Sequence, residues 1–133
     1  MKVHGSCHCG RVTYNAEVDP QRVNICHCSD CQALTGSAYR LSVATEVEDF
    51  VLETGEPKVY TKVAESGAER AQVFCSNCGS PLYAYAVGHP TTYGLRTGCI
   101  AERSELVPRM QIWCESAQDW SMNIEALPAR GRE

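Results

Sequence analysis

The sequence has neither a long apolar run nor a signal peptide. No stretch approaches the roughly 18 apolar residues that a membrane-spanning helix needs. The first ten residues lack the apolar core of a secretory signal and already include Cys7 and Cys9. We therefore expect a cytoplasmic protein, in a compartment that keeps thiols reduced.

An excess of basic residues is also absent. The chain has 12 lysines and arginines against 16 aspartates and glutamates, which gives a formal net charge of −4. This balance argues against a general attraction to nucleic acid or to an anionic membrane, so we expect neither as a partner. Repeats, linkers and low-complexity segments are missing too, and 133 residues are enough for one ordinary domain. We expect residues 1–133 to form a single domain.

Cysteine, in contrast, is abundant, and its spacing is informative. The nine cysteines are Cys7, Cys9, Cys26, Cys28, Cys31, Cys75, Cys78, Cys99 and Cys114. An odd count and a reducing compartment disfavour a disulfide scaffold, and such close neighbours suit disulfide geometry poorly. Closely spaced thiolates are typical of a metal site, and zinc suits these spacings better than an iron–sulfur cluster or redox dithiol chemistry.

Two close pairs each end in glycine: Cys7-His8-Cys9-Gly10 and Cys75-Ser76-Asn77-Cys78-Gly79. A chelating loop turns its amide groups towards the sulfurs, and glycine permits the positive φ that this requires. Two ligands from each loop would close a four-cysteine shell, which is typical of a structural zinc. Metal binding would then contribute to folding, on the order of 10 kcal/mol or more.

A third group, Cys26, Cys28 and Cys31, offers three sulfurs. Three protein ligands and one open position are typical of reactive zinc sites. Either Cys99 or Cys114 could supply a fourth sulfur, which would make this a second structural site. His8 and His27 lie between the cysteines, but we expect them to shape the loops, because cysteines alone satisfy zinc.

The remaining pattern predicts a mainly β fold with little helix. Alternation and turn residues predict strands at 11–18, 38–45, 51–53, 58–63, 70–74, 81–87, 92–97 and 109–114. Residues 58–63 and 70–74 should form a hairpin. A helical turn is expected at 47–50 and a short helix at 30–35, with a capping box from Ser29 to Gln32 and a stop at Gly36. The polar tail from Leu127 to Glu133 should be frayed.

For several other side chains the sequence predicts a place in the core or on the surface rather than a role in the site. His4 and His89 should be on the surface, and Cys99 and Cys114 should be small buried hydrophobes. Aromatic residues expected in the core or half-buried are Trp113, Trp120, Tyr83 and Tyr85. Arginines expected to be exposed are Arg40, Arg96 and Arg109, although one of them could hold a carboxylate of a ligand.

The cysteine motifs carry a resemblance to a known family. The segments are Gly5-Ser6-Cys7-His8-Cys9-Gly10, Cys26-His27-Cys28-Ser29-Asp30-Cys31-Gln32, Thr35-Gly36-Ser37 and Phe74-Cys75-Ser76-Asn77-Cys78-Gly79-Ser80-Pro81. In this order they resemble the glutathione-dependent formaldehyde-activating enzymes, also called the GFA or centromere-protein-V domain, from about Gly5 to Trp120.

The resemblance implies an Mss4-like, zinc-bound β fold with two zinc ions. It implies a structural zinc on Cys7, Cys9, Cys75 and Cys78, and a second zinc on Cys26, Cys28 and Cys31 whose ligands serve catalysis. The implied reaction joins glutathione and formaldehyde into S-(hydroxymethyl)glutathione, or cleaves that carbon–sulfur bond as a lyase. A small-molecule thiol such as glutathione is the expected partner.

Two positions differ from the family pattern. The segment Gly98-Cys99-Ile100-Ala101 lies where members often have a Leu-Asp pair, and Gln111 stands where histidine is common. These positions bear on the substrate. A second hypothesis is a non-catalytic, zinc-stabilised binding module in which both zinc ions are structural.

Overall fold

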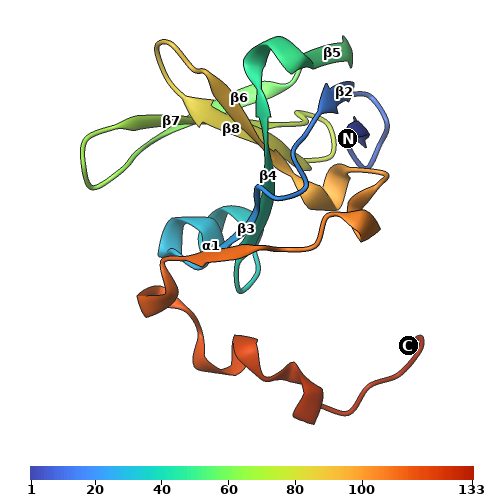
Figure 1. Ribbon diagram of the computed structural model, residues 1–133, viewed down its shortest axis with the longest axis vertical. Helices are drawn as coiled ribbons and strands as arrows, with labels where there is room; N and C mark the ends of the chain where they lie inside the picture. The colour runs from blue at the N-terminus through green and yellow to red at the C-terminus, as the bar shows by residue number, and fades with distance from the viewer.

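Ten strands and one helix form the fold in the computed structural model, which describes residues 1–133 (Figure 1). The strands are β1 (Lys2–Ser6), β2 (Thr13–Glu17), β3 (Val23–Cys26), β4 (Arg40–Glu46), β5 (Phe50–Thr54), β6 (Lys58–Val63), β7 (Glu69–Phe74), β8 (Pro81–Ala86), β9 (Thr92–Arg96) and β10 (Met110–Ile112). The helix is α1 (Ser29–Thr35). Short 3₁₀ turns are η1 (Val47–Asp49), η2 (Thr97–Cys99), η3 (Arg103–Glu105), η4 (Cys114–Ser116), η5 (Asp119–Met122) and η6 (Ile124–Ala126).

The strands form two sheets. The small sheet has the order β1-β2-β5, and the large one has the order β10-β3-β4-β9-β8-β7-β6. All neighbouring strands are antiparallel except β10 and β3, which are parallel. The mainly β class predicted from the alternating pattern is confirmed.

An aromatic cluster joins the two sheets. Phe50 of β5 lies 5.0 Å from Tyr14 of β2, 4.8 Å from Tyr83 of β8 and 5.1 Å from Tyr93 of β9, measured between ring centroids. Tyr85 lies 5.2 Å from Tyr93. Such tilted and edge-on pairs add stabilisation beyond the burial of apolar area. Tyr83 is buried and Tyr85 half-buried, as predicted.

Most predicted elements are present, with shifted ends. The hairpin of β6 and β7 and the turn at η1 match closely, and the strand expected at 109–114 covers only Met110–Ile112. Strand β1 was not predicted, because Gly5 interrupts its hydrophobic alternation. The predicted cap of α1 is wrong: Cys28, not Ser29, is the N-cap, and its sulfur accepts a hydrogen bond from the Cys31 N–H. The predicted stop at Gly36 is confirmed by its left-handed φ of 63°.

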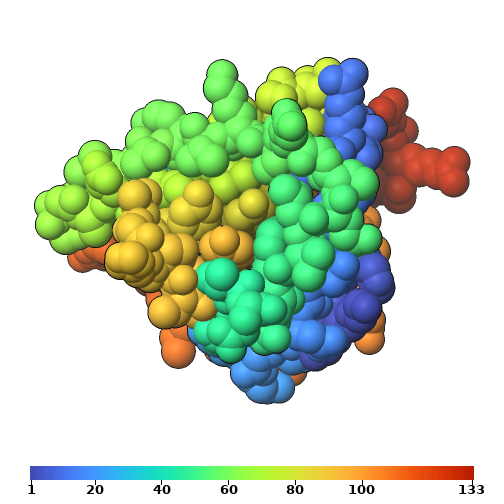
Figure 2. Space-filling view, turned by 90° about the horizontal axis from the view of Figure 1, so that it is seen from above, coloured from blue at the N-terminus to red at the C-terminus, as the bar shows by residue number.

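The C-terminal part lies apart from the core. Beyond β10 the chain runs along one side of the molecule and ends away from the sheets (Figure 1). In the space-filling view its last residues, in red, project on the side opposite the β6–β7 hairpin (Figure 2). Trp113 and Trp120 are 52% and 61% exposed. Their predicted burial is therefore wrong, because β10 borders the large sheet and the segment after it leaves the core. No helix in the structure has the length and apolar composition to span a membrane.

Candidate metal centres

The two cysteine pairs meet at one point, although they are far apart in the sequence. Cys7 and Cys9 follow β1, and Cys75 and Cys78 lie in the turn between β7 and β8. The four sulfurs all lie within 4.8 Å of one another. The Cys7 and Cys9 sulfurs are 3.6 Å apart, and those of Cys9 and Cys75 are 3.8 Å apart.

The loops present hydrogen-bond donors to these sulfurs. Gly10 and Gly79 have φ angles of 81° and 78°, the positive values expected of the glycines that end the loops. The Val12 N–H donates to Cys7 Sγ at 3.3 Å, and Ser80 Oγ lies 3.3 Å from Cys78 Sγ. Hydrogen bonds from the Ser80 hydroxyl and backbone lower the pKa of Cys78 to about 5. The loop thus favours the thiolate form of Cys78, which is the form that binds metal.

The spacing of the four sulfurs fits zinc. Zinc–sulfur bonds of about 2.3 Å in a tetrahedron place the sulfurs about 3.8 Å apart. The separations of 3.6 and 3.8 Å agree with that value. Four thiolates complete a tetrahedral shell, so a metal held here would link β1 to the β7–β8 turn.

The cysteine triplet lies around the start of α1. Cys26 ends β3, Cys28 caps the helix, and Cys31 lies within its first turn with no exposed surface. The three sulfurs also lie within 4.8 Å of one another. Those of Cys28 and Cys31 are 3.1 Å apart, so a zinc ion would have to spread them slightly. Three thiols in this arrangement could hold a metal that has an open position.

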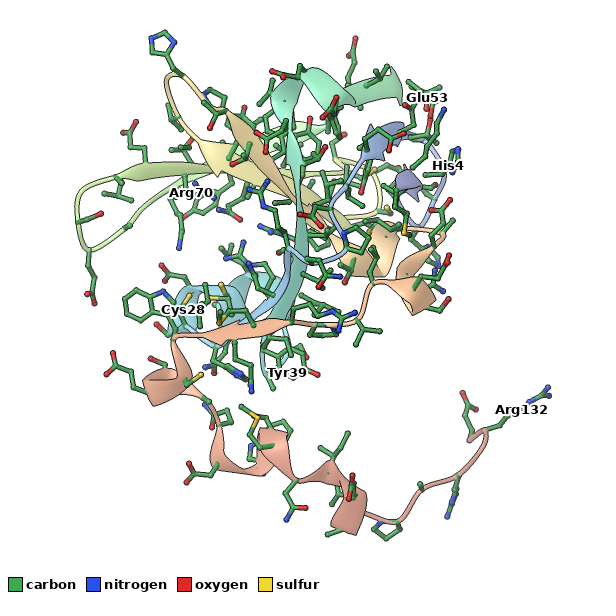
Figure 3. All side chains as sticks on the ribbon, in the orientation of Figure 1. His4, Cys28, Tyr39, Glu53, Arg70 and Arg132 are labelled. Carbon is green, nitrogen blue, oxygen red and sulfur yellow. The ribbon has the colours of Figure 1, made fainter.

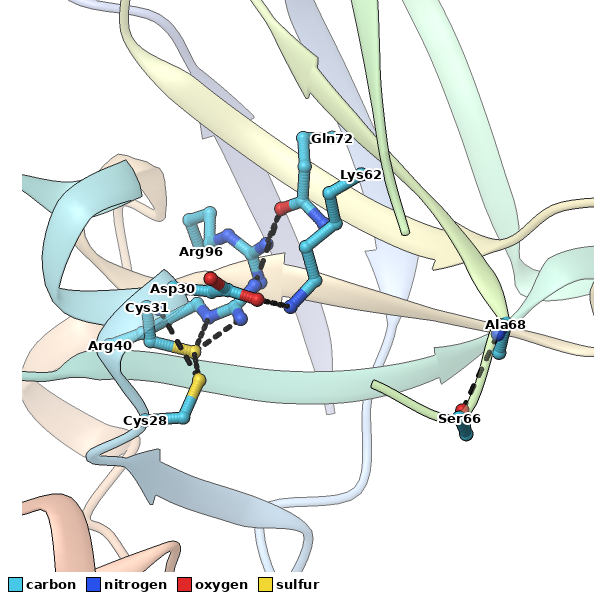
Figure 4. Close-up of polar contacts among 9 residues, drawn as sticks. All are labelled: Cys28, Asp30, Cys31, Arg40, Lys62, Ser66, Ala68, Gln72 and Arg96. Carbon is cyan, nitrogen blue, oxygen red and sulfur yellow. Dashed lines mark hydrogen bonds and ion pairs between the residues drawn. The ribbon is translucent and has the colours of Figure 1, made fainter. Parts of the chain in front are cut away.

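Arg40 reaches the triplet from the large sheet. Its Nε donates to Cys31 Sγ at 3.1 Å, and its Nη2 also contacts this sulfur (Figure 4). Burial raises the pKa of the Cys31 thiol to about 12, and the Arg40 guanidinium opposes that rise. Burial alone would also raise the pKa of Cys28, but its hydrogen bonds with the Cys31 thiol and with the Cys31 backbone N–H lower the pKa overall.

No fourth cysteine joins the triplet. The Cys99 thiol contacts the Pro81 carbonyl at 3.3 Å, and Cys114 is exposed. The predicted burial of Cys114 is therefore wrong, because η4 lies in the segment that leaves the core. Cys99 is half-buried and packs against the hydrophobic core. Neither His8 nor His27 belongs to a cysteine cluster.

His27 is held from the other side of the triplet. Its ring has no exposed surface, and its Nε2 lies 2.9 Å from Gln111 Oε1 on β10. Gln32 Nε2 donates to the His27 carbonyl at 2.8 Å. Of the two positions that differ from the family pattern, Gln111 therefore supports the residue between Cys26 and Cys28. Ala101 instead donates its N–H to the His4 carbonyl of β1 at 2.9 Å.

Two cavities flank the triplet. One, of about 340 Å³, is lined by Arg40, Arg96, Gln72 and Tyr83 among others. The second, of about 600 Å³, contains Cys28 in its lining. Figure 3 shows the side chain of Arg70 on β7 directed towards the side of the molecule where Cys28 lies.

The predicted exposure of the arginines is confirmed for one of them and wrong for another. Arg109 is exposed as predicted, and His4 and His89 are exposed too. Arg96 is only 8% exposed, so its predicted exposure is wrong. It lies across the inner face of β9, where its guanidinium bonds to Ser42 and Gln72. Arg40 is half-buried. Both arginines lie at the end of a strand, since Arg40 begins β4 and Arg96 ends β9.

Comparison with known proteins gives similar chains. A Halomonas elongata protein, provisionally named a glutathione-dependent formaldehyde-activating enzyme, is 28% identical over 127 residues, covering 90% of this chain and 80% of the relative. An uncharacterized lyase of Schizosaccharomyces pombe is 32% identical over 85 residues, covering 63% of this chain and 58% of the relative.

A solved structure supports the fold. The crystal structure of a Rhodobacter sphaeroides protein superposes with a TM-score of 0.64 and 20% identity, covering 84% of this chain and 99% of the other. The model of the glutathione-dependent formaldehyde-activating enzyme family matches residues 2–116, which include both cysteine clusters. The chain therefore belongs to the family of glutathione-dependent formaldehyde-activating enzymes.

Proposed function

We propose that this protein is a zinc-dependent carbon–sulfur lyase that acts on an adduct of a small-molecule thiol. The adduct is of the kind that glutathione forms with formaldehyde. In the forming direction, a thiol sulfur bonds to the carbonyl carbon, and the carbonyl oxygen gains the electron pair and a proton. The reverse direction breaks the same carbon–sulfur bond.

The observation that carries this proposal is the unequal size of the two cysteine clusters. Cys7, Cys9, Cys75 and Cys78 form a group of four, which suits a closed structural zinc site. Cys26, Cys28 and Cys31 form a group of three with no further cysteine, histidine or carboxylate in the group. Three protein ligands leave a coordination position that a substrate thiol can occupy.

The metal would supply one chemical effect at the triplet. A bound zinc lowers the pKa of an incoming thiol, so that this sulfur is a thiolate near neutral pH. The chain's own residues hold the site. Arg40 donates to Cys31 Sγ and stabilises negative charge on this buried sulfur. The Cys31 backbone N–H donates to Cys28 Sγ at 3.3 Å.

Access to the triplet supports a small-molecule ligand. Cys28 is partly exposed and lines the cavity of about 600 Å³, whereas Cys26 and Cys31 are buried. A ligand in that cavity can bring its sulfur to the triplet from the solvent side. The names of the Halomonas and Schizosaccharomyces relatives, an enzyme dependent on glutathione and a lyase, agree with this assignment.

Calorimetric titration of glutathione into zinc-loaded protein tests the proposal, with S-methylglutathione as the matched ligand that lacks a free sulfur. We expect glutathione to bind at least about tenfold more tightly, since a metal–thiolate contact contributes more than 1.4 kcal/mol. Formaldehyde should then be consumed in the presence of glutathione. Equal binding of the two ligands, or no binding of either, would instead favour the binding module with two structural zinc ions.

A further inference from the structure

Trp113 has an unusual backbone conformation. Its φ of 58° and ψ of 38° are left-handed, and it is the only residue other than glycine with a positive φ. A bulky residue rarely adopts this conformation, because its Cβ then lies too close to a backbone carbonyl oxygen. Strain of this kind persists only where the surrounding structure enforces it, and it is concentrated at functional sites. The indole of Trp113 is therefore a candidate for contact with a ligand.

The chain on both sides of Trp113 is anchored next to the cysteine triplet. On one side, the Ile112 carbonyl accepts a hydrogen bond from the His27 N–H at 3.0 Å. On the other side, the Ser116 carbonyl accepts one from Gln32 Nε2 at 3.0 Å, and the Ser116 N–H donates to the Trp113 carbonyl at 3.1 Å. His27 lies within the triplet motif, and Gln32 follows it directly in α1. These anchors hold the strained residue in a fixed position relative to the three thiols.

The indole of Trp113 lines the cavity of about 600 Å³ whose lining also includes Cys28. Residues 62–66 of the β6–β7 hairpin line the same cavity. Trp113 is 52% exposed and Val63 is 64% exposed, so the cavity presents two large apolar side chains beside a thiol of the triplet. Covering such side chains with an apolar group of a ligand is favourable, because it removes apolar surface from water.

We propose that Trp113 determines specificity for the carbonyl component of the adduct, which is an aldehyde with an aromatic substituent rather than formaldehyde. This proposal rests on the proposed function, because it names the second component of the same adduct. The thiol sulfur bonds to the aldehyde carbon, the carbonyl oxygen takes the electron pair and a proton, and the substituent stays on that carbon.

With the sulfur at the triplet, the substituent lies in the cavity beside Cys28, where the planar indole of Trp113 can stack on it. Formaldehyde has no substituent to place there. Cavities of roughly 300–1,000 Å³ accommodate ligands far larger than a one-carbon group, and this cavity of about 600 Å³ is of that size. The cavity therefore suits a carbonyl compound with a ring.

Calorimetry on zinc-loaded protein with two stable thioethers tests the proposal. S-Benzylglutathione has a phenyl group on the carbon bonded to sulfur, so it resembles an aromatic aldehyde adduct that lacks the hydroxyl group. S-Methylglutathione is the corresponding analogue of the formaldehyde adduct. We expect S-benzylglutathione to bind about tenfold more tightly than S-methylglutathione. In Trp120→Phe, Trp113 is the only tryptophan left, and S-benzylglutathione should change its fluorescence more than S-methylglutathione does.

The variant Trp113→Gly separates ligand contact from a structural role. Glycine adopts a positive φ without strain, so the variant should fold, with a denaturant midpoint close to that of the wild type. Its preference for S-benzylglutathione over S-methylglutathione should fall by about tenfold, while Trp113→Phe keeps a ring and should retain part of the preference. Trp120→Gly is the matched control, because Trp120 is 61% exposed in the same segment and does not line this cavity. It should leave the preference unchanged.

The outcomes distinguish this proposal from the function on which it rests. Equal affinity for the two thioethers, or an unchanged preference in Trp113→Gly, would overturn the role of Trp113. Tighter binding of glutathione than of S-methylglutathione would in that case leave the thiol function in place. A preference for S-benzylglutathione that depends on Trp113, with equal binding of glutathione and S-methylglutathione, would support the aromatic contact and contradict the thiol function.

Two further results would count against the role of Trp113. An equal loss of preference in Trp120→Gly would overturn it, since the effect would then belong to the whole segment. If Trp113→Gly fails to fold, the fluorescence of Trp120→Phe decides, and an equal response to the two thioethers would overturn the proposal. Binding of none of the three ligands would overturn both the proposal and the function.

Discussion

The guanidinium of Arg40 donates a hydrogen bond to the sulfur of Cys31 at 3.1 Å. Arg40 begins β4, whereas Cys31 lies in α1, so the contact links the sheet to the helix at the cysteine triplet. A fixed cation beside the Cys31 thiol opposes the rise that burial causes in the pKa of this group, and so favours its anionic form. The contact therefore links the fold of the large sheet to the chemistry of the candidate second metal site.

Replacing Arg40 should make the triplet release zinc at higher pH. Protons compete with the metal for thiolates, so zinc leaves as pH falls. Arg40 opposes the burial that raises the pKa of Cys31 to about 12. In Arg40→Met that opposition is lost, and the pH at which half the triplet zinc is released should rise by about one pH unit.

The release can be followed with a chromogenic zinc chelator across a pH series. Arg109→Met is the matched control, because Arg109 is exposed and its contact in the structure is made by its backbone N–H to the Val23 carbonyl. An unchanged release curve in Arg40→Met would show that the arginine does not stabilise the thiolates.

Serine substitutions in the two clusters should have different effects. Cys75→Ser should abolish cooperative unfolding, because a closed zinc shell contributes on the order of 10 kcal/mol to folding. Cys31→Ser should keep the fold, bind one zinc fewer per chain and lose lyase activity. Metal analysis and thermal unfolding of both variants make the comparison, with the exposed Cys114→Ser as the unaffected control. Unfolding of Cys31→Ser to the same degree as Cys75→Ser would indicate two structural sites.

Gly5 packs against the ring of Tyr14, and a larger residue should not fit. A Cβ atom at Gly5 would lie 2.0 Å from Cζ and 2.2 Å from Cε1 of Tyr14. The Tyr14 ring is fully buried and cannot move aside without repacking Phe50. Gly5→Ala should lower the free energy of unfolding by about 1–3 kcal/mol or more.

Denaturant unfolding measures this loss. Gly98→Ala is the control, because a Cβ there meets nothing within 4 Å. Equal stability of the two variants would mean that the β1–β2 contact adapts to the added methyl group.

Gln111 should stabilise the protein through His27. The amide oxygen lies 2.9 Å from His27 Nε2, and Nδ1 of this buried ring has no partner. Gln111→Leu would leave both nitrogens of the His27 ring unpaired and should lower the free energy of unfolding by at most about 1 kcal/mol. Gln111 is exposed, so water can replace part of the lost hydrogen bond. Gln111→Glu keeps an acceptor and should retain most of the stability. If denaturant unfolding shows equal losses for leucine and glutamate, the hydrogen bond does not contribute.

Local pattern predicts the parts of the site that lie close together in the chain. The spacing within Cys26-His27-Cys28-Ser29-Asp30-Cys31 predicts a cluster of three thiols, and they do lie together. A helix cap and its first turn bring Cys28 and Cys31, three residues apart, to one side, and Cys26 lies two residues before the cap. The glycines at 10 and 79 were predicted to have positive φ for the same local reason, and they do.

Tertiary structure decides which residues from distant parts of the chain lie together. Trp113 and Trp120 have apolar rings and were therefore predicted in the core or half-buried. The chain leaves the core after β10, and both rings are exposed. Arg40 and Arg96 were expected outside, yet sheet register places them on one face against Gln72. No local pattern encodes these outcomes, because each depends on which strands pair.

The sequence by itself determined which residues could bind a metal, namely two cysteine pairs that each end in glycine and a cysteine triplet at the start of a short helix. It also determined that the chain is mainly β. Only the tertiary structure decided that β1 and the β7–β8 turn bring Cys7 and Cys75 together, and that Cys99 and Cys114 stay outside the triplet. Bond geometry sets spacings over a few residues, whereas contacts over long separations depend on strand pairing and on the packing of the two sheets.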